Sequence, residues 1–199
     1  MPIAIAFVAG NFIHRTTTKP EERLTKSQES QVLSIQFSQP QVPVVRFPRD
    51  IYPEIKISEI TLPQIQVQEN QHLTIITIPT NLLFECGKHQ IHEKAKQVLN
   101  QVSQAINNRY PGSWLQILGH ADSRRTQKEN LQLSEERATA VQQWLSEKVR
   151  LNVSAITKEG YGATQPIVSN MKFDCFNNPT GRQKNRRIEI VIQKLNNQL

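Results

Sequence analysis

Cysteine, aromatic residues and long apolar runs are scarce in this sequence, and each absence excludes a class of protein. Its two cysteines, Cys86 and Cys175, are too few for a disulfide scaffold and lack the spacing of a zinc site, so we expect two unrelated thiols, with one long-range disulfide as the alternative. The sequence has no glycine-rich phosphate loop, and no serine or cysteine stands in a nucleophile elbow. We therefore expect a protein that is not an enzyme and that uses neither a metal nor a cofactor.

An apolar stretch without charged side chains opens the sequence, over residues 1–14. A helix that crosses a membrane needs about 20 apolar residues, and a signal peptide begins with basic residues. The stretch matches neither requirement. Two interpretations stay open: it is the end of a membrane anchor, which would associate the chain with a membrane, or it is a buried strand or a short signal-type hydrophobic region.

The net charge of +7 is unevenly spread along the chain. Residues 1–70 carry seven basic and seven acidic side chains, so the whole excess falls on residues 71–199. A basic surface attracts polyanions such as nucleic acid, anionic lipid or acidic wall polymer, without choosing among them. The basic cluster at 182–187 has no interleaved aromatic residues on which bases could stack, so nucleic acid is a weak alternative and not an expected partner.

Proline divides the chain into two regions. Seven of its 11 prolines lie before residue 70, where they separate short β-like runs and forbid long helices and central strands. Residues 15–70 are therefore predicted to be a polar, proline-rich spacer with a few edge strands. Residues 71–199 are predicted to form the folded domain.

The domain region alternates strand-like and helix-like patterns. Strands are predicted at 73–78, 114–118, 155–161 and 188–192, and a loop at 162–184. Two amphipathic helices are predicted between the first three strands. The first carries an apolar stripe of Ile91, Ala95, Val98, Leu99, Val102, Ala105 and Ile106. The second begins with a capping box from Thr126 to Glu129 and runs to about Lys148. The predicted fold is an α/β (α+β) sandwich of β-α-β-α-β-β order, with helices packed on a mixed sheet.

A charged residue interrupts the stripe of the second predicted helix. At 100° per residue, Arg137 falls among Leu133, Ala140 and Trp144, where an unpaired guanidinium would cost several kcal/mol. Asp122 follows the second predicted strand, at the kind of strand end where ligands bind in α/β sheets. Two interpretations are open: the two side chains pair with each other, or they hold a ligand.

Several segments in this order resemble the OmpA-like peptidoglycan-binding family. They are LFECG at 83–87, GHADS at 119–123, NLQLSEERA at 130–138, GYG at 160–162 and GRQKNRRIEI at 181–190. The resemblance implies that 83–87 form the first strand and turn, and that the chain binds peptidoglycan without covalent chemistry. It further implies that Asp122 takes the ammonium and Arg137 the carboxylate of the diaminopimelate in the stem peptide, and that Thr126 and Asn130 line the same pocket.

The chain departs from the family pattern at the pocket. Arg124 and Arg125 replace small residues of many relatives, and Gly87 stands where some relatives carry an Asp. The resemblance implies a place on the periplasmic face of the bacterial cell envelope, with other envelope proteins contacted through the N-terminal region. The alternative is the wall-anchoring part of a motor-stator (MotB-like) or secretion complex, but an ion-driven role needs a carboxylate within the membrane, and residues 1–14 contain none.

A histidine pair gives a weaker hint of metal chemistry. His89 and His92 lie three residues apart at the start of the first predicted helix. A zinc site needs a third and usually a fourth ligand, so two solvated histidines are expected here instead.

Overall fold

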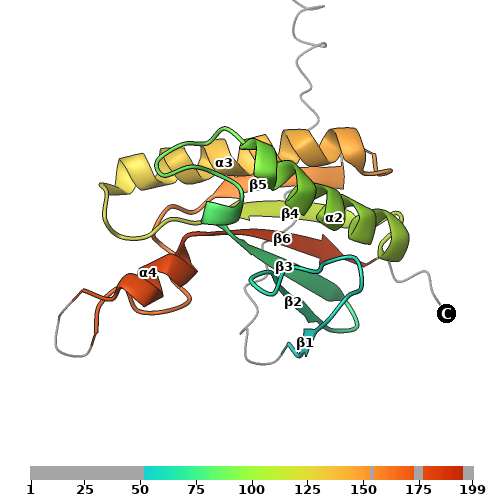
Figure 1. Ribbon diagram of the computed structural model, residues 1–199, viewed down its shortest axis with the longest axis horizontal. Coiled ribbons are helices and arrows are strands. Elements are labelled where there is room, and N and C mark those ends of the chain that lie inside the picture. The colour runs from blue at the N-terminus through green and yellow to red at the C-terminus, as the bar shows by residue number, and fades with distance from the viewer. Residues whose placement is uncertain (1–51, 153–154, 173–176, 195–199) are drawn as a thin grey trace, which may run out of the picture. The chain divides into compact units, whose positions relative to one another are not determined.

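Two long helices cover one face of a mixed β-sheet in the computed structural model (Figure 1). The structure describes residues 52–152, 155–172 and 177–194. The described strands are β1 (Glu54–Ile55), β2 (Gln66–Glu69), β3 (Leu73–Pro79), β4 (Trp114–Gly119), β5 (Ile156–Gly160) and β6 (Arg187–Gln193). The helices are the 3₁₀ turn η2 (Thr80–Leu82), α2 (Glu93–Arg109), α3 (Gln127–Lys148) and the short α4 (Pro179–Asn185). The predicted mixed sheet with packed helices is confirmed.

Helix α2 is the more apolar of the two long helices that pack on the sheet. It begins where His92 Nδ1 accepts a hydrogen bond from the N–H of Ala95 at 2.9 Å. The buried side chains of α2 are Ala95, Val98, Leu99, Val102, Ser103, Ala105 and Ile106, which confirms the predicted stripe within the helix. Burial of a large aliphatic side chain stabilises a fold by about 1.5–3 kcal/mol. This face therefore contributes much of the stability of the helix layer.

Helix α3 starts at the predicted capping box, with Thr126 and Glu129 each satisfying the other's backbone N–H. Its buried face carries Asn130, Ser134, Arg137, Ala138, Val141 and Leu145. Leu133 and Trp144, which were predicted to belong to the apolar stripe, are only partly buried. The cause is close packing against two glycines: a Cβ at Gly119 would lie 2.0 Å from Ser134 O, and one at Gly160 would lie 2.5 Å from Glu135 N. The helix backbone rests on the sheet there, so small polar side chains face it.

The last strand lies in the middle of the sheet. The strand order is β1-β2-β3-β6-β4-β5. Strand β6 pairs antiparallel with both β3 and β4, whereas β4 and β5 are parallel and are joined through α3. The carboxyl ends of β3, β4 and β5 therefore meet the beginning of β6 at one edge of the sheet. The core lies between this sheet and the two long helices.

Two predictions about connecting segments are wrong. Residues 162–184 were predicted as a loop, but α4 forms there because Asn178 caps it, accepting a hydrogen bond from the N–H of Gly181, and Pro179 fits its first turn. The segment 83–87 is not a strand: Phe84 makes only an isolated bridge with Ile91, after β3 has already ended.

The sheet begins upstream of the predicted domain region. Strand β2 pairs with β3, and Ile57, Ile65 and Val67 are buried in the core. The described residues belong to a compact unit that starts at Phe47. The boundary at residue 71 stays a prediction about how an isolated fragment folds. Residues 1–14 lie outside the described residues, and within the described ranges no helix is both long and apolar enough to cross a membrane.

Candidate functional site

The candidate site lies at the edge where β3, β4 and β5 end. The loop 120–126 leaves β4 beside the end of β5, fixed by a hydrogen bond from the N–H of Ala121 to the carbonyl of Gly162 at 2.8 Å. On the other side, the N–H of His120 donates to the carbonyl of Arg187 at 3.0 Å. The loop 120–126, the start of β6 and the first half of α3 therefore lie close together. Ligands bind at such strand ends because several loops present side chains to the same space.

Asp122 lies in this edge with its carboxylate buried and bound by arginines. Its Oδ2 accepts hydrogen bonds from Arg124 Nε at 2.9 Å and from Arg186 Nη1 at 2.6 Å, and Arg182 Nε lies 3.9 Å away. Its Oδ1 accepts the backbone N–H of Arg124 at 3.2 Å. Burial acts to raise the pKa of the Asp122 carboxyl, but the hydrogen bonds from Arg186 and Arg124 outweigh it and hold the pKa below its ordinary value. The carboxylate is therefore charged.

Arg137 is a buried cation on α3. Only 5% of the residue is exposed. Its guanidinium lies over the Phe84 ring, 5.2 Å from the centroid, and its Nε donates to the carbonyl of Lys88 at 2.9 Å. Burial lowers the pKa of Arg137, and repulsion from Arg125 and Arg186 lowers it further, yet an arginine stays protonated. The packing holds a charged fork at the edge of the sheet.

No ion pair joins the two predicted ligand residues. Within the described residues, the ion pairs of Asp122 go to Arg124, Arg182 and Arg186, and no carboxylate lies within 4.0 Å of the Arg137 guanidinium. The structure brings Asp122 and Arg137 to the same edge but leaves Arg137 without a counter-ion there. A buried guanidinium without a counter-ion is costly, so a ligand anion at this place would stabilise it.

Thr126 and Asn130 lie next to the loop that holds Asp122. Thr126 is exposed, and its hydroxyl is engaged in the capping box: Oγ1 accepts the N–H of Glu129 at 3.2 Å and donates to its carboxylate at 2.7 Å. Asn130 is buried, and its amide donates to the carbonyl of Arg125 at 3.1 Å. Both side chains therefore fix the path of the loop.

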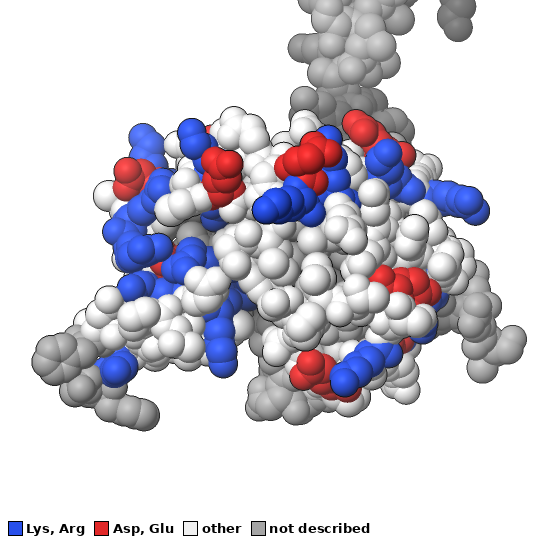
Figure 2. Space-filling view, in the orientation of Figure 1, with Lys and Arg blue, Asp and Glu red and all other residues white. Residues whose placement is uncertain are grey.

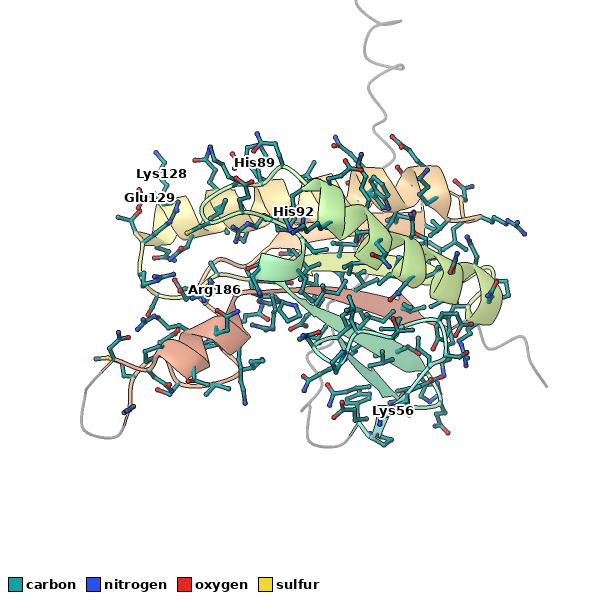
Figure 3. The ribbon with its side chains drawn as sticks, in the orientation of Figure 1. Lys56, His89, His92, Lys128, Glu129 and Arg186 are labelled. Atoms are coloured by element: carbon teal, nitrogen blue, oxygen red, sulfur yellow. The ribbon has the colours of Figure 1, made fainter. Side chains whose placement is uncertain are left out.

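Sequence reasoning missed Arg186 as a contact of the site. The structure shows that Arg186 donates a hydrogen bond to Asp122, 64 residues away in the chain. Figure 3 shows Arg186 between the loop that enters α3 and helix α4. The basic run at 182–187 was a signal that cations gather there. The sequence could not show that they reach Asp122, because it does not reveal that the following strand lies at the centre of the sheet.

Lys and Arg gather at the end of the domain where α3 begins and α4 lies (Figure 2). Arg124, Arg182 and Arg186 surround Asp122, and Arg187 is only 2% exposed, with its ion-pair partner Glu189. Much of the basic run is therefore engaged inside the domain. This arrangement weighs against a nucleic-acid surface, which needs cations free to reach phosphates.

The histidines serve separate roles. His92 caps α2, and His89 Nδ1 lies 3.1 Å from Glu136 Oε2. His120 is buried, stacked on Tyr161 with ring centroids 5.6 Å apart. No group of three potential metal ligands occurs among His, Cys, Asp and Glu of the described residues. Cys86 is an exposed thiol, and Cys175 lies outside the described ranges.

The fold and the site define a class of protein: an α+β binding domain that presents fixed charges at a sheet edge. The sequence model of the OmpA family matches residues 83–186. The chain belongs to the OmpA family, a family of peptidoglycan-binding domains, whose members are structural wall-binding proteins and not enzymes. The expectation that the chain is not an enzyme is thereby confirmed.

Two relatives and one solved structure illustrate the likeness. The chain is 40% identical over 119 residues to a photosystem I chlorophyll a apoprotein A2 of Gloeobacter violaceus, covering 60% of this chain and 13% of that protein. It is 31% identical over 112 residues to a peptidoglycan-associated lipoprotein of Buchnera aphidicola, covering 56% of this chain and 60% of that protein. It thus spans less than two thirds of either relative. The cell wall anchor of the T6SS from Pseudomonas aeruginosa has the same fold, with 24% identity and a TM-score of 0.57. The match covers 66% of this chain and 89% of that chain.

Proposed function

We propose that the domain binds peptidoglycan without covalent chemistry, and that Asp122 and Arg137 grip the diaminopimelate of the stem peptide. The observation that carries this proposal is Arg137: a cation that is 5% exposed, held by Phe84 and the Lys88 carbonyl, with no carboxylate of the described residues as partner. A carboxylate of the ligand would supply the missing counter-ion. Family membership supports peptidoglycan as the source of that carboxylate.

The chemistry of the two side chains suits a zwitterionic head group. The terminal nitrogens of Arg137 can fork a carboxylate with two parallel hydrogen bonds. A carboxylate has about four acceptor positions, and Asp122 uses three of them on Arg124 and Arg186. The remaining position is on Oδ1, which can accept the ammonium of the same head group. Thr126 and Asn130 act in this proposal by holding the loop that carries Asp122.

The domain thereby anchors or spaces an envelope protein against the wall, on the periplasmic face of the cell envelope. Several relatives are named as outer membrane proteins or lipoproteins, which supports this location. In the Gloeobacter relative the matched region is 13% of a much longer protein, which supports the role of a module joined to other parts. The N-terminal residues before this compact unit, which starts at Phe47, then connect the module to a membrane or to other envelope proteins.

Co-sedimentation with purified peptidoglycan tests the proposal. Arg137→Gln keeps a donor for the Lys88 carbonyl but removes the charge, and we expect binding to fall about tenfold or more, the equivalent of a charge-assisted hydrogen bond. The matched control is Arg150→Gln, an exposed arginine beyond the other end of α3, which should bind as the wild type does. A stem peptide with Lys in place of diaminopimelate should bind more weakly, because it lacks the carboxylate for Arg137. Undiminished binding by Arg137→Gln would overturn the proposed site.

A further inference from the structure

The site holds more positive charge than a zwitterionic ligand neutralises. Asp122 is already matched by Arg124 and Arg186. Two further guanidiniums, those of Arg125 and Arg137, have no ion-pair partner among the described residues. A head group with one ammonium and one carboxylate adds no net charge. The surplus therefore remains after such a ligand binds.

The guanidiniums of Arg125, on the loop before α3, and of Arg137, on α3, contact the same turn at Gly87 and Lys88. A Cβ at Gly87 would lie 2.9 Å from Arg125 Nη2, so the guanidinium of Arg125 rests over the Gly87 backbone. The next residue, Lys88, supplies the carbonyl that accepts from Arg137 Nε at 2.9 Å. Gly87 makes this approach with φ of +72°, a conformation that suits glycine. The guanidiniums of Arg125 and Arg137 thus contact adjacent residues, Gly87 and Lys88, of one turn.

Packing does not explain why Arg125 is there. Its side chain is exposed, and the nearby carboxylate of Glu129 is hydrogen-bonded to Thr126 in the capping box. Its backbone, by contrast, is fixed, because its carbonyl accepts the amide of the buried Asn130 at 3.1 Å. Burial lowers the pKa of Arg137, and repulsion from Arg125 lowers it further. Two neighbouring cations that repel each other gain most from an anion that lies between or beside them.

We propose that Arg125, above Gly87 and beside Arg137, forms a second anion subsite that takes a second free carboxylate of the wall peptide, next to the diamino acid. The inference rests on the proposed function and adds a specificity to it. Peptides in which that neighbouring carboxylate is free bind more tightly than the same peptides with it amidated. Amidation removes one negative charge while keeping shape and size, so it isolates the charge that Arg125 recognises.

The experiment measures the affinity of two soluble stem peptides, both containing diaminopimelate, one with the adjacent glutamyl carboxylate free and one with it amidated. For the wild type and for the control Arg150→Gln we expect about tenfold tighter binding of the free acid, typical of one charge-assisted contact. For Arg125→Gln we expect the same weaker affinity for both peptides. Because Arg125 is exposed, the variant should melt at the temperature of the wild type.

Each result decides between the two proposals. If the wild type binds both peptides equally, or if Arg125→Gln keeps the preference, the second subsite is overturned while the proposed function stands. If the wild type binds neither peptide, the proposed function fails and the subsite fails with it. Equal binding of both peptides together with Arg125-dependent retention of a phosphate-rich wall polymer would replace the carboxylate with a phosphate and also overturn the inference.

Discussion

Helices α2 and α3 lie on the same sheet face but bury different chemistry (Figure 1). Helix α2 buries aliphatic side chains along its whole length, with a single serine among them. Helix α3 buries aliphatic residues only from Ala138 onward, and its first turns bury Asn130, Ser134 and Arg137 instead. The polar half of α3 is the half that reaches the edge where the strands end. One helix therefore serves packing throughout, while the other combines packing with the polar side chains of the candidate site.

The largest loss of stability is expected in the apolar helix. Leu99 is fully buried in α2, and Leu99→Ala should reduce the free energy of unfolding by about 2–5 kcal/mol through lost burial and a cavity. Denaturant unfolding measures the change, with the exposed Gln97→Ala as the control. Where the variant is still folded, it should bind peptidoglycan as the wild type does. Impaired peptidoglycan binding by a Leu99→Ala protein that is still folded would contradict the division of roles between the two helices.

A smaller loss of stability is expected for Asp122→Asn, because the substitution weakens the hydrogen bonds from Arg124 and Arg186. The free energy of unfolding should fall by about 1.5–3 kcal/mol. The pKa of Asp122 is lowered in the folded state, so the carboxylate stabilises the fold above the unfolded pKa of about 3.9 and this contribution is lost as pH falls below it. Unfolding of both proteins across pH measures the effect. The difference between wild type and variant should shrink below about pH 4; a difference that does not change with pH would contradict the role given to the carboxylate.

A loss of about 1 kcal/mol is expected for Thr126→Ala, which removes the cap of α3. The loop before the helix would also lose a fixed point, so peptide binding should weaken slightly. Thermal melting and peptide titration measure the two effects. Ser123→Ala, at an exposed position of the same loop, is the control and should change neither.

The smallest effect on stability is expected where the effect on binding is largest. Arg137→Gln removes a buried charge that Arg125 and Arg186 repel, and it keeps a donor for the Lys88 carbonyl. The free energy of unfolding should therefore change by less than about 1 kcal/mol, or rise. Denaturant unfolding beside Leu99→Ala provides the comparison. A loss as large as that of Leu99→Ala would make Arg137 a packing residue and would remove the contrast between the helices.

The sequence predicted what depends on local spacing. The stripe of α2, the capping box of α3 and four of the strands follow from periodicity and helix-start chemistry, and Arg137 was placed on the buried face by its angle alone. The predicted stripe of α3 included Leu133, which is only partly buried, because the contact of the helix backbone with Gly119 and Gly160 depends on which strands lie beneath it. That contact is set by the tertiary fold and leaves no periodic pattern.

The partners of Asp122 depend on long-range order. Arg186 reaches Asp122 only because β6 enters the sheet between β3 and β4, and spacing along the chain does not reveal this insertion. Helix α4 was missed for a different reason. Its seven residues include a glycine and too few turns for an apolar stripe, so only the start signals of Asn178 and Pro179 support a helix.

The central position of β6 also governs when the domain can be completed. Until residues 187–193 have been synthesised, β3 and β4 have no strand between them, and both would expose unpaired edges to other chains. Folding during synthesis or during passage through a membrane channel would therefore stop short of the native sheet, because its middle strand emerges last of the six described. Arg186, immediately before that strand, reaches Asp122 in the same closing step. A nascent chain thus acquires the middle strand of its sheet and the Arg186–Asp122 ion pair together.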